Sequence, residues 1–99
     1  MTAPIEITLL TQHACAYCDQ AKQVLERVGR DYPLRITEID LALEEGRRLA
    51  EGAGVLFAPG VLVDGAPFSF GRLSERRLRR VLARRSRTDT GVRATRSPD

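Results

Sequence analysis

The residues best suited to chemistry are two cysteines that stand three positions apart, in the sequence Cys15-Ala16-Tyr17-Cys18. They are the only cysteines among the 99 residues. Two thiols at this spacing can close a disulfide ring, and one of them can be held as a reactive thiolate. The same spacing occurs in zinc sites, so the pair alone leaves both thiol–disulfide exchange and metal binding open.

The segments on either side of the cysteines indicate how they are positioned. Residues 5–11 alternate between apolar and polar and then become continuously apolar, which is typical of a central strand. From Cys15 or Ala16 to Val28, apolar residues recur every three or four positions, which predicts a helix that stops at Gly29. The cysteines therefore lie where a strand passes into the N-terminus of a helix.

The rest of the chain completes a mixed α/β pattern. We expect a strand over 34–39, a helix over about 41–52 capped by Asp40, strands 60–63 and 66–70 around a type I′ turn at Asp64-Gly65, and a helix over about 74–85 capped by Ser74. The order β-α-β-α-β-β-α makes the first two strands parallel and the last two antiparallel. It predicts a thioredoxin-like α/β fold, in which a four-stranded mixed sheet is flanked by three helices on both faces.

Composition indicates one domain. The chain is 42% hydrophobic and 29% charged, as in ordinary globular proteins. We expect this domain to span residues 1–85 and the polar residues 86–99 to form a flexible tail. No apolar run approaches the roughly 18 residues of a membrane span, and the N-terminus lacks a signal-peptide pattern. A cytoplasmic location is therefore expected, where paired cysteines are more often catalytic or metal-binding than structural.

The helix start suggests different roles for the two thiols. A helix N-terminus carries unpaired N–H groups and a partial positive charge, which would stabilise a thiolate at Cys15. Cys18 is nearly one turn further along and on the core-facing side. This arrangement predicts that Cys15 attacks a substrate disulfide and that Cys18 resolves the mixed disulfide. A charged His13 could assist Cys15, although a loop histidine without an essential role is the simpler interpretation.

The proline before the third strand completes a resemblance to the glutaredoxin family. Ala58-Pro59 directly precedes residues 60–63, and the likeness runs from about Ile5 to Arg84. Cys-Ala-Tyr-Cys differs from the family's usual Cys-Pro-Tyr-Cys by one residue. The resemblance implies a dithiol oxidoreductase that reduces protein or low-molecular-weight disulfides without a bound cofactor. Glutathione or another low-molecular-weight thiol is then the candidate reductant.

The resemblance also implies roles for individual residues. Cys15 would be the nucleophile, Cys18 the resolving thiol and Pro59 a cis-proline. Substrate would be bound around Tyr17, Ala58, Pro59 and Gly71.

Three departures from the family pattern concern the substrate more than the reaction. Gln12 replaces the Lys that glutathione-binding members usually carry before the first cysteine, and Phe57-Ala58 replaces their Thr-Val. The stretch from Phe70 to Glu75 keeps only Gly71, and in part Ser74 with Glu75, of the pattern that holds the γ-glutamyl end. The reaction is therefore better determined by the sequence than its substrate.

The positive charge is concentrated near the C-terminus and leaves a second interpretation open. Residues 1–71 hold six Lys/Arg and ten Asp/Glu, whereas residues 72–87 hold eight Arg and one Glu. The alternative to an enzyme is a binding module, which would carry metal on the cysteines or contact an acidic partner or nucleic acid through residues 72–87. Arginines at helical spacing without interleaved aromatics are more typical of a solvated helix face.

We expect no metal, because zinc usually takes four protein ligands and, beyond the two cysteines, the chain offers one histidine and carboxylates that look exposed. The expected partners are a disulfide-containing protein or small molecule, and a thiol or reductase that donates electrons. We expect a monomer that contacts neither membrane nor nucleic acid.

Overall fold

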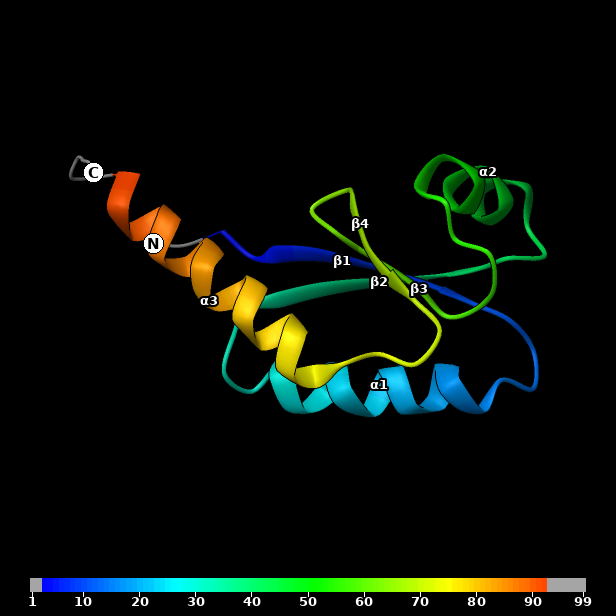
Figure 1. Cartoon of the computed structure of the whole chain (residues 1–99), viewed down its shortest axis with the longest axis horizontal. Helices are drawn as coiled ribbons and strands as arrows, with labels where there is room; N and C mark the ends of the chain where they lie inside the picture. Colours follow the sequence, from blue (N-terminus) through cyan, green and yellow to red (C-terminus); the bar gives the residue numbers. More distant parts are fainter. Residues whose placement is uncertain (1–2, 93–99) are drawn as a thin grey trace.

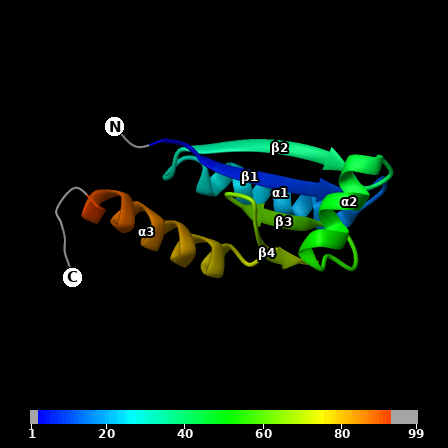
Figure 2. The same cartoon turned by 90° about the horizontal axis from the view of Figure 1, so that it is seen from above.

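The computed structural model describes residues 3–92 and confirms the predicted order of elements. The elements are β1 (Ile5–Thr11), α1 (Ala16–Val28), β2 (Leu34–Asp40), α2 (Glu44–Ala53), β3 (Gly60–Val63), β4 (Ala66–Phe70) and α3 (Glu75–Val92). The four strands form one mixed sheet in the order β2-β1-β3-β4, with β1 parallel to β2 and antiparallel to β3. Figures 1 and 2 show α1 and α3 on one face of this sheet and α2 over one end of the other.

The main core lies between the sheet and the helices α1 and α3. Alternate residues of β1 and β3 point to this face because strand side chains alternate with a period of two. The core cluster comprises Ile5, Ile7, Leu9, Ala21, Val24, Leu25, Val28, Val61, Val63, Leu73, Leu78 and Leu82. The apolar residues of α1 that recur at three and four positions are all buried, and they are Cys18, Ala21, Val24, Leu25 and Val28. The packing of α1 thus determines which way the second cysteine points.

The start of α2 differs from the prediction. The expected cap at Asp40 with a helix from residue 41 is wrong, because α2 begins at Glu44 after the N-cap Leu43. The Asp40 side chain accepts a hydrogen bond from the N–H of Ala42 at 2.7 Å, and its carbonyl accepts one from the N–H of Leu43 at 3.0 Å. Asp40 therefore closes a turn that must be completed before the helix can start.

Helix α2 packs closely on the end of β2. A Cβ added at Gly46 would overlap the backbone carbonyl of Asp40, so only glycine allows this approach. The helix ends at Ala53 and is followed by the C-cap residue Gly54, which has a left-handed backbone with φ of +73°.

The β3–β4 hairpin confirms the predicted turn. Asp64 and Gly65 both have positive φ, 51° and 83°, as a type I′ turn requires. The Asp64 carboxylate also accepts a hydrogen bond from the N–H of Glu6 at 3.0 Å and pairs with Arg85 at 2.6 Å. The turn is therefore attached to both β1 and α3.

Helix α3 begins as predicted but ends later. Ser74 caps it, since its Oγ accepts a hydrogen bond from the N–H of Arg77 at 3.2 Å. The predicted end near residue 85 is wrong, because the helix continues to Val92 and projects past the sheet (Figures 1 and 2). No glycine or proline interrupts the sequence between Ser86 and Gly91, and extending a helix is easier than starting one.

The predicted tail over 86–99 thus begins inside a helix, and residues 93–99 lie outside the described part. None of the described helices has the length and apolarity needed to cross a membrane.

Candidate redox site

Cys15 and Cys18 are joined by a disulfide, with their Cα atoms 5.1 Å apart. Cys15 is the N-cap residue of α1, and its Sγ accepts a hydrogen bond from the N–H of Cys18 at 3.0 Å. Cys18 is only 3% exposed, whereas Cys15 is partly accessible. The two sulfurs therefore differ in their accessibility to solvent. The more accessible one, that of Cys15, lies at the end of α1 where the backbone N–H groups have no partner within the helix.

A tight loop brings the chain from β1 into Cys15. Ala14, directly before the cysteine, has φ of +53°, which costs a non-glycine residue about 1–2 kcal/mol. His13 is exposed, and the structure gives it no hydrogen bond or ion pair with any described residue. Among the residues that the structure describes, no side chain of this loop therefore forms a hydrogen bond or ion pair with the Cys15 sulfur.

The sheet register places the predicted proline at the same end of the sheet as the cysteines. Leu10 pairs with Gly60, and Gly60 pairs with Phe70. Pro59 and Gly71, the neighbours of these residues in sequence, thus lie beside the end of β1, from which the chain continues to Cys15. In Figure 1 this end carries α2 and the N-terminus of α1.

The proline itself has the form that the family resemblance implies. The Ala58–Pro59 peptide bond is cis, and both residues are buried. The Pro59 carbonyl accepts a hydrogen bond from the N–H of Gly71 at 2.8 Å. The Gly71 N–H is therefore already engaged within the protein.

Aromatic and aliphatic side chains are exposed at this end. We name Leu56, Phe57 and Phe70 the apolar rim; they are 79%, 54% and 38% exposed. The rings of Phe57 and Phe70 meet edge to face with centroids 5.0 Å apart. A Cβ added at Gly71, whose φ is +82°, would lie 3.0 Å from the Phe57 ring. Gly71 thus leaves room for Phe57. Tyr17, within the cysteine motif, is also half-exposed.

The apolar rim cannot be recognised as a unit from the sequence. Phe57 and Phe70 are thirteen positions apart in sequence, and only the pairing of Gly60 with Phe70 brings them together. The available signal was that each stands next to a residue singled out for the site, Phe57 beside Ala58 and Phe70 beside Gly71.

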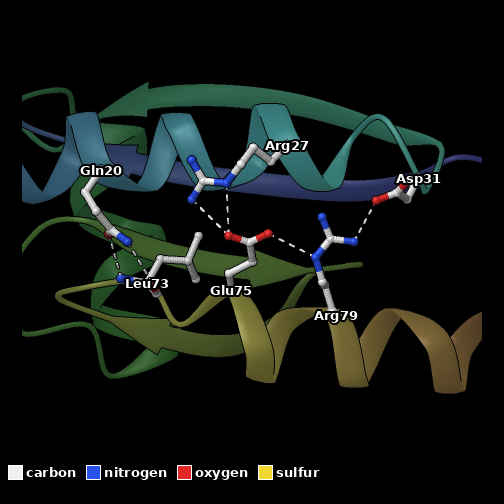
Figure 3. Close-up of polar contacts among 6 residues, drawn as sticks. All are labelled: Gln20, Arg27, Asp31, Leu73, Glu75 and Arg79. Carbon is white, nitrogen blue, oxygen red and sulfur yellow. Dashed lines mark hydrogen bonds and ion pairs between the residues drawn. The ribbon is translucent and has the colours of Figure 1, made fainter.

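One glutamine attaches the segment after Gly71 to α1 (Figure 3). The Gln20 side chain donates a hydrogen bond to the carbonyl of Leu73 and accepts one from the N–H of Leu73, both at 3.0 Å. Gln20 lies two residues beyond Cys18, so the same helix that positions the cysteines positions this loop. A polar residue beside the apolar face of α1 was the only sequence signal for this role.

Further along, α1 and α3 are joined by ion pairs. Figure 3 shows the Glu75 carboxylate between Arg27 and Arg79. Its two oxygens lie 2.9 Å from Nη2 of Arg27 and 3.0 Å from Nε of Arg79. Arg79 also binds Asp31 at 2.8 Å. The hydrogen bond from Arg27, followed by that from Arg79, lowers the pKa of Glu75 below its ordinary value. The bonds to Asp31 and then Glu75 raise the pKa of Arg79. These contacts hold α3 against α1.

The basic segment 72–87 is partly used inside the domain. Arg79 and Arg85 are in ion pairs, and the Arg77 guanidinium lies over the Phe68 ring, 5.3 Å from its centroid. These contacts fit the interpretation of a solvated helix face; nucleic-acid binding stays an untested alternative. Among residues 3–92, no group of three or more His, Cys, Asp or Glu side chains is placed to hold a metal ion.

The fold and the two cysteines define a thioredoxin-fold protein with a disulfide-forming CxxC pair. The chain belongs to the family of the glutaredoxin-like domain (DUF836), whose model matches residues 6–83. The glutaredoxin-like resemblance predicted from the sequence is thus confirmed. No curated protein sequence matches the chain significantly.

Two solved thioredoxins have the same fold. A single-substitution mutant of thioredoxin from Halobacterium salinarum superposes with a TM-score of 0.63 at 20% identity, over 81% of this chain and 73% of that one. Oxidized mitochondrial thioredoxin 3 from Saccharomyces cerevisiae gives a TM-score of 0.62 at 15% identity, over 84% and 80% of the two chains. At these identities the likeness establishes the fold alone.

Proposed function

We propose that this protein is a dithiol thiol–disulfide oxidoreductase that reduces protein or low-molecular-weight disulfides. The observation that carries the proposal is the difference between its two sulfurs. Cys15 is partly accessible at the N-cap of α1, and Cys18 is buried within bonding distance of it. An accessible sulfur can meet a substrate, and a shielded neighbour can react only with the first sulfur.

The proposed reaction transfers two electrons from the protein to the substrate. The Cys15 thiolate attacks one substrate sulfur, which forms a mixed disulfide and releases the other substrate sulfur as a thiolate that takes a proton. Cys18 then loses its proton and attacks Cys15. The Cys15–Cys18 disulfide forms, and the second substrate thiol leaves. The substrate disulfide has become a dithiol, and the protein dithiol a disulfide.

A thiol donor must then return two electrons to the protein. We propose glutathione, another low-molecular-weight thiol or a reductase in this role, in a cytoplasmic setting where such donors are abundant, with the protein acting as a monomer. Tyr17, Ala58 and Pro59 are the proposed substrate contacts beside the cysteines. Gly71 is proposed to act by shape, because its N–H is engaged by Pro59.

Single cysteine variants test this assignment. Reduced wild-type protein should release the coloured thiolate from 5,5′-dithiobis(2-nitrobenzoate) and end as the internal disulfide. Cys18→Ser should instead stop as a stable mixed disulfide on Cys15, which mass spectrometry would locate, whereas Cys15→Ser should react only at the background rate of a buried thiol. Thiol titration should also show one group well below the ordinary cysteine pKa of about 8.5 that is lost in Cys15→Ser. If Cys15→Ser reacts as fast as wild type, the assigned roles are wrong.

A further inference from the structure

A groove of about 350 Å³ runs along β4, at the free edge of the sheet. It is lined by the end of α2, by the strand itself and by α3, through Ala53, Gly54, Val55, Pro67, Phe68, Ser69, Phe70 and Arg77. Phe70 belongs both to this groove and to the apolar rim. The groove is therefore continuous with the exposed apolar surface at the cysteine end of the sheet.

The far side of the groove carries a positive charge at Arg77. Its guanidinium lies over the Phe68 ring, which holds it beside the groove, and the residue is exposed. Among the side chains that the structure describes, no carboxylate forms an ion pair with Arg77, whereas Arg79 and Arg85 each have such a partner. Arg77 thus remains available to an anionic group from outside.

The strand beside the groove offers a backbone donor. The Gly71 N–H is directed at Pro59, on the β3 side. Because N–H directions alternate along a strand, the N–H of Phe70 is directed towards the free edge. An extended peptide can use such an edge through main-chain hydrogen bonds.

We propose that this groove binds an extended acidic segment of a polypeptide substrate, whose disulfide meets Cys15 and whose carboxylate pairs with Arg77. The proposal rests on the function proposed above and specifies its substrate class. An extended chain advances about 3.3 Å per residue, so the five residues of β4 correspond to roughly 17 Å. A segment of about five residues would therefore cover β4, so we place the acidic residue of the test peptides about five positions from the cysteine. A tripeptide such as glutathione is shorter than this strand.

Matched peptides test the proposal directly. Each probe carries one cysteine in mixed disulfide with 2-nitro-5-thiobenzoate and either glutamate or lysine about five positions away, in both chain directions. Reduced wild-type protein should react about three- to tenfold faster with the glutamate peptide than with the lysine peptide, a range consistent with one partly exposed ion pair. Raising the salt concentration should reduce this preference.

Two charge reversals on α3 distinguish an effect of the groove on the peptide preference from an effect of the overall charge of the helix. Arg77→Glu should reverse the preference, so that the lysine peptide reacts faster. Arg80→Glu makes the same change in charge at an exposed residue that does not line the groove, and it should leave the preference nearly as in wild type. In the Cys18→Ser mixed disulfide, the Phe70 amide should be more protected from hydrogen exchange with the glutamate peptide than with the lysine peptide.

The outcomes distinguish the two proposals. If wild type releases no thiolate from either peptide or from 5,5′-dithiobis(2-nitrobenzoate), the oxidoreductase function itself is wrong. If wild type reduces both peptides at equal rates, and Arg77→Glu and Arg80→Glu have the same preference, the oxidoreductase function is retained. The proposal that the groove binds an acidic segment is then wrong.

Discussion

The α1–α3 side of the sheet and its cysteine end are built in opposite ways. On the first, large apolar residues such as Leu25, Leu78 and Leu82 are at most 1% exposed. Hydrogen bonds and ion pairs connect α1 with α3 and with the segment that precedes it. At the second, Leu56 and Phe57 are more than half exposed beside a buried cis-proline. One region uses its apolar side chains for packing, and the other presents them to solvent.

The difference separates stability from recognition within one small domain. Burial of apolar area is what stabilises the fold, so the α1–α3 side should dominate the free energy of unfolding. Exposed rings contribute little to folding, and a contiguous exposed apolar surface is more typical of a binding site. The cysteines stand between the two regions, since Cys18 belongs to the packed side and Cys15 to the exposed end.

The strongest test removes a large apolar side chain from each region. Leu78→Ala should lower the free energy of unfolding by about 2–5 kcal/mol, because Leu78 is fully buried in the core cluster. Phe57→Ala should cost about 1 kcal/mol, mostly for the lost edge-to-face contact with Phe70. Urea titrations of both variants measure this contrast, and equal losses would mean that the apolar rim is part of the folding core.

A substitution at Gly46 should show that the cysteine end is not loosely packed throughout. Gly46→Ala adds a methyl group against the Asp40 backbone carbonyl, which cannot rotate away. We expect a loss of about 1–3 kcal/mol despite the higher helix propensity of alanine. Gly52→Ala on the same helix is the matched control, because nothing lies near its added Cβ, and it should be neutral or stabilising in thermal melts.

Gln20 connects the α1–α3 side with the cysteine end, and its removal should change both the stability of the fold and the hydrogen exchange of the loop after β4. Gln20→Ala leaves the N–H and C=O of Leu73 without their partner, at an expected cost of about 1–2 kcal/mol. The same change should increase hydrogen exchange at Leu73 and Gly71 while the chemistry at Cys15 with a small disulfide persists. Gln23→Ala, on the exposed face of α1, serves as the control. Unchanged exchange at Leu73 would contradict an anchoring role for Gln20.

The smallest expected effect is the pH dependence of the Glu75 ion pairs. Because Arg27 and Arg79 lower the pKa of Glu75, its stabilisation is present above the ordinary value of 4.5 and is lost as the pH falls through the lower folded pKa. Glu75→Gln should therefore melt at a lower temperature than wild type at neutral pH and approach it in acid. Glu26→Gln, an exposed neighbour of Arg27, should show no such convergence.

The sequence by itself determined the order of the seven elements, the position of Cys15 at a helix start, the buried side of α1 and the type I′ turn at Asp64-Gly65. These features follow from local rules: strand and helix periodicity, helix-end electrostatics and the backbone preferences of turn residues. The same rules predicted α2 and α3 while misplacing the start of one and the end of the other, because a turn at Asp40 competes with the helix cap and nothing before Gly91 stops α3.

Only the tertiary structure decided which residues share the cysteine end. Strand pairing brings Phe57 to Phe70 and Pro59 to Gly71, and helix packing brings Gln20 to Leu73. None of these contacts has a local signature, because each depends on the register of strands or the approach of helices far apart in sequence. The cysteine motif could therefore be recognised from the sequence, whereas the surface and groove around it depend on the fold.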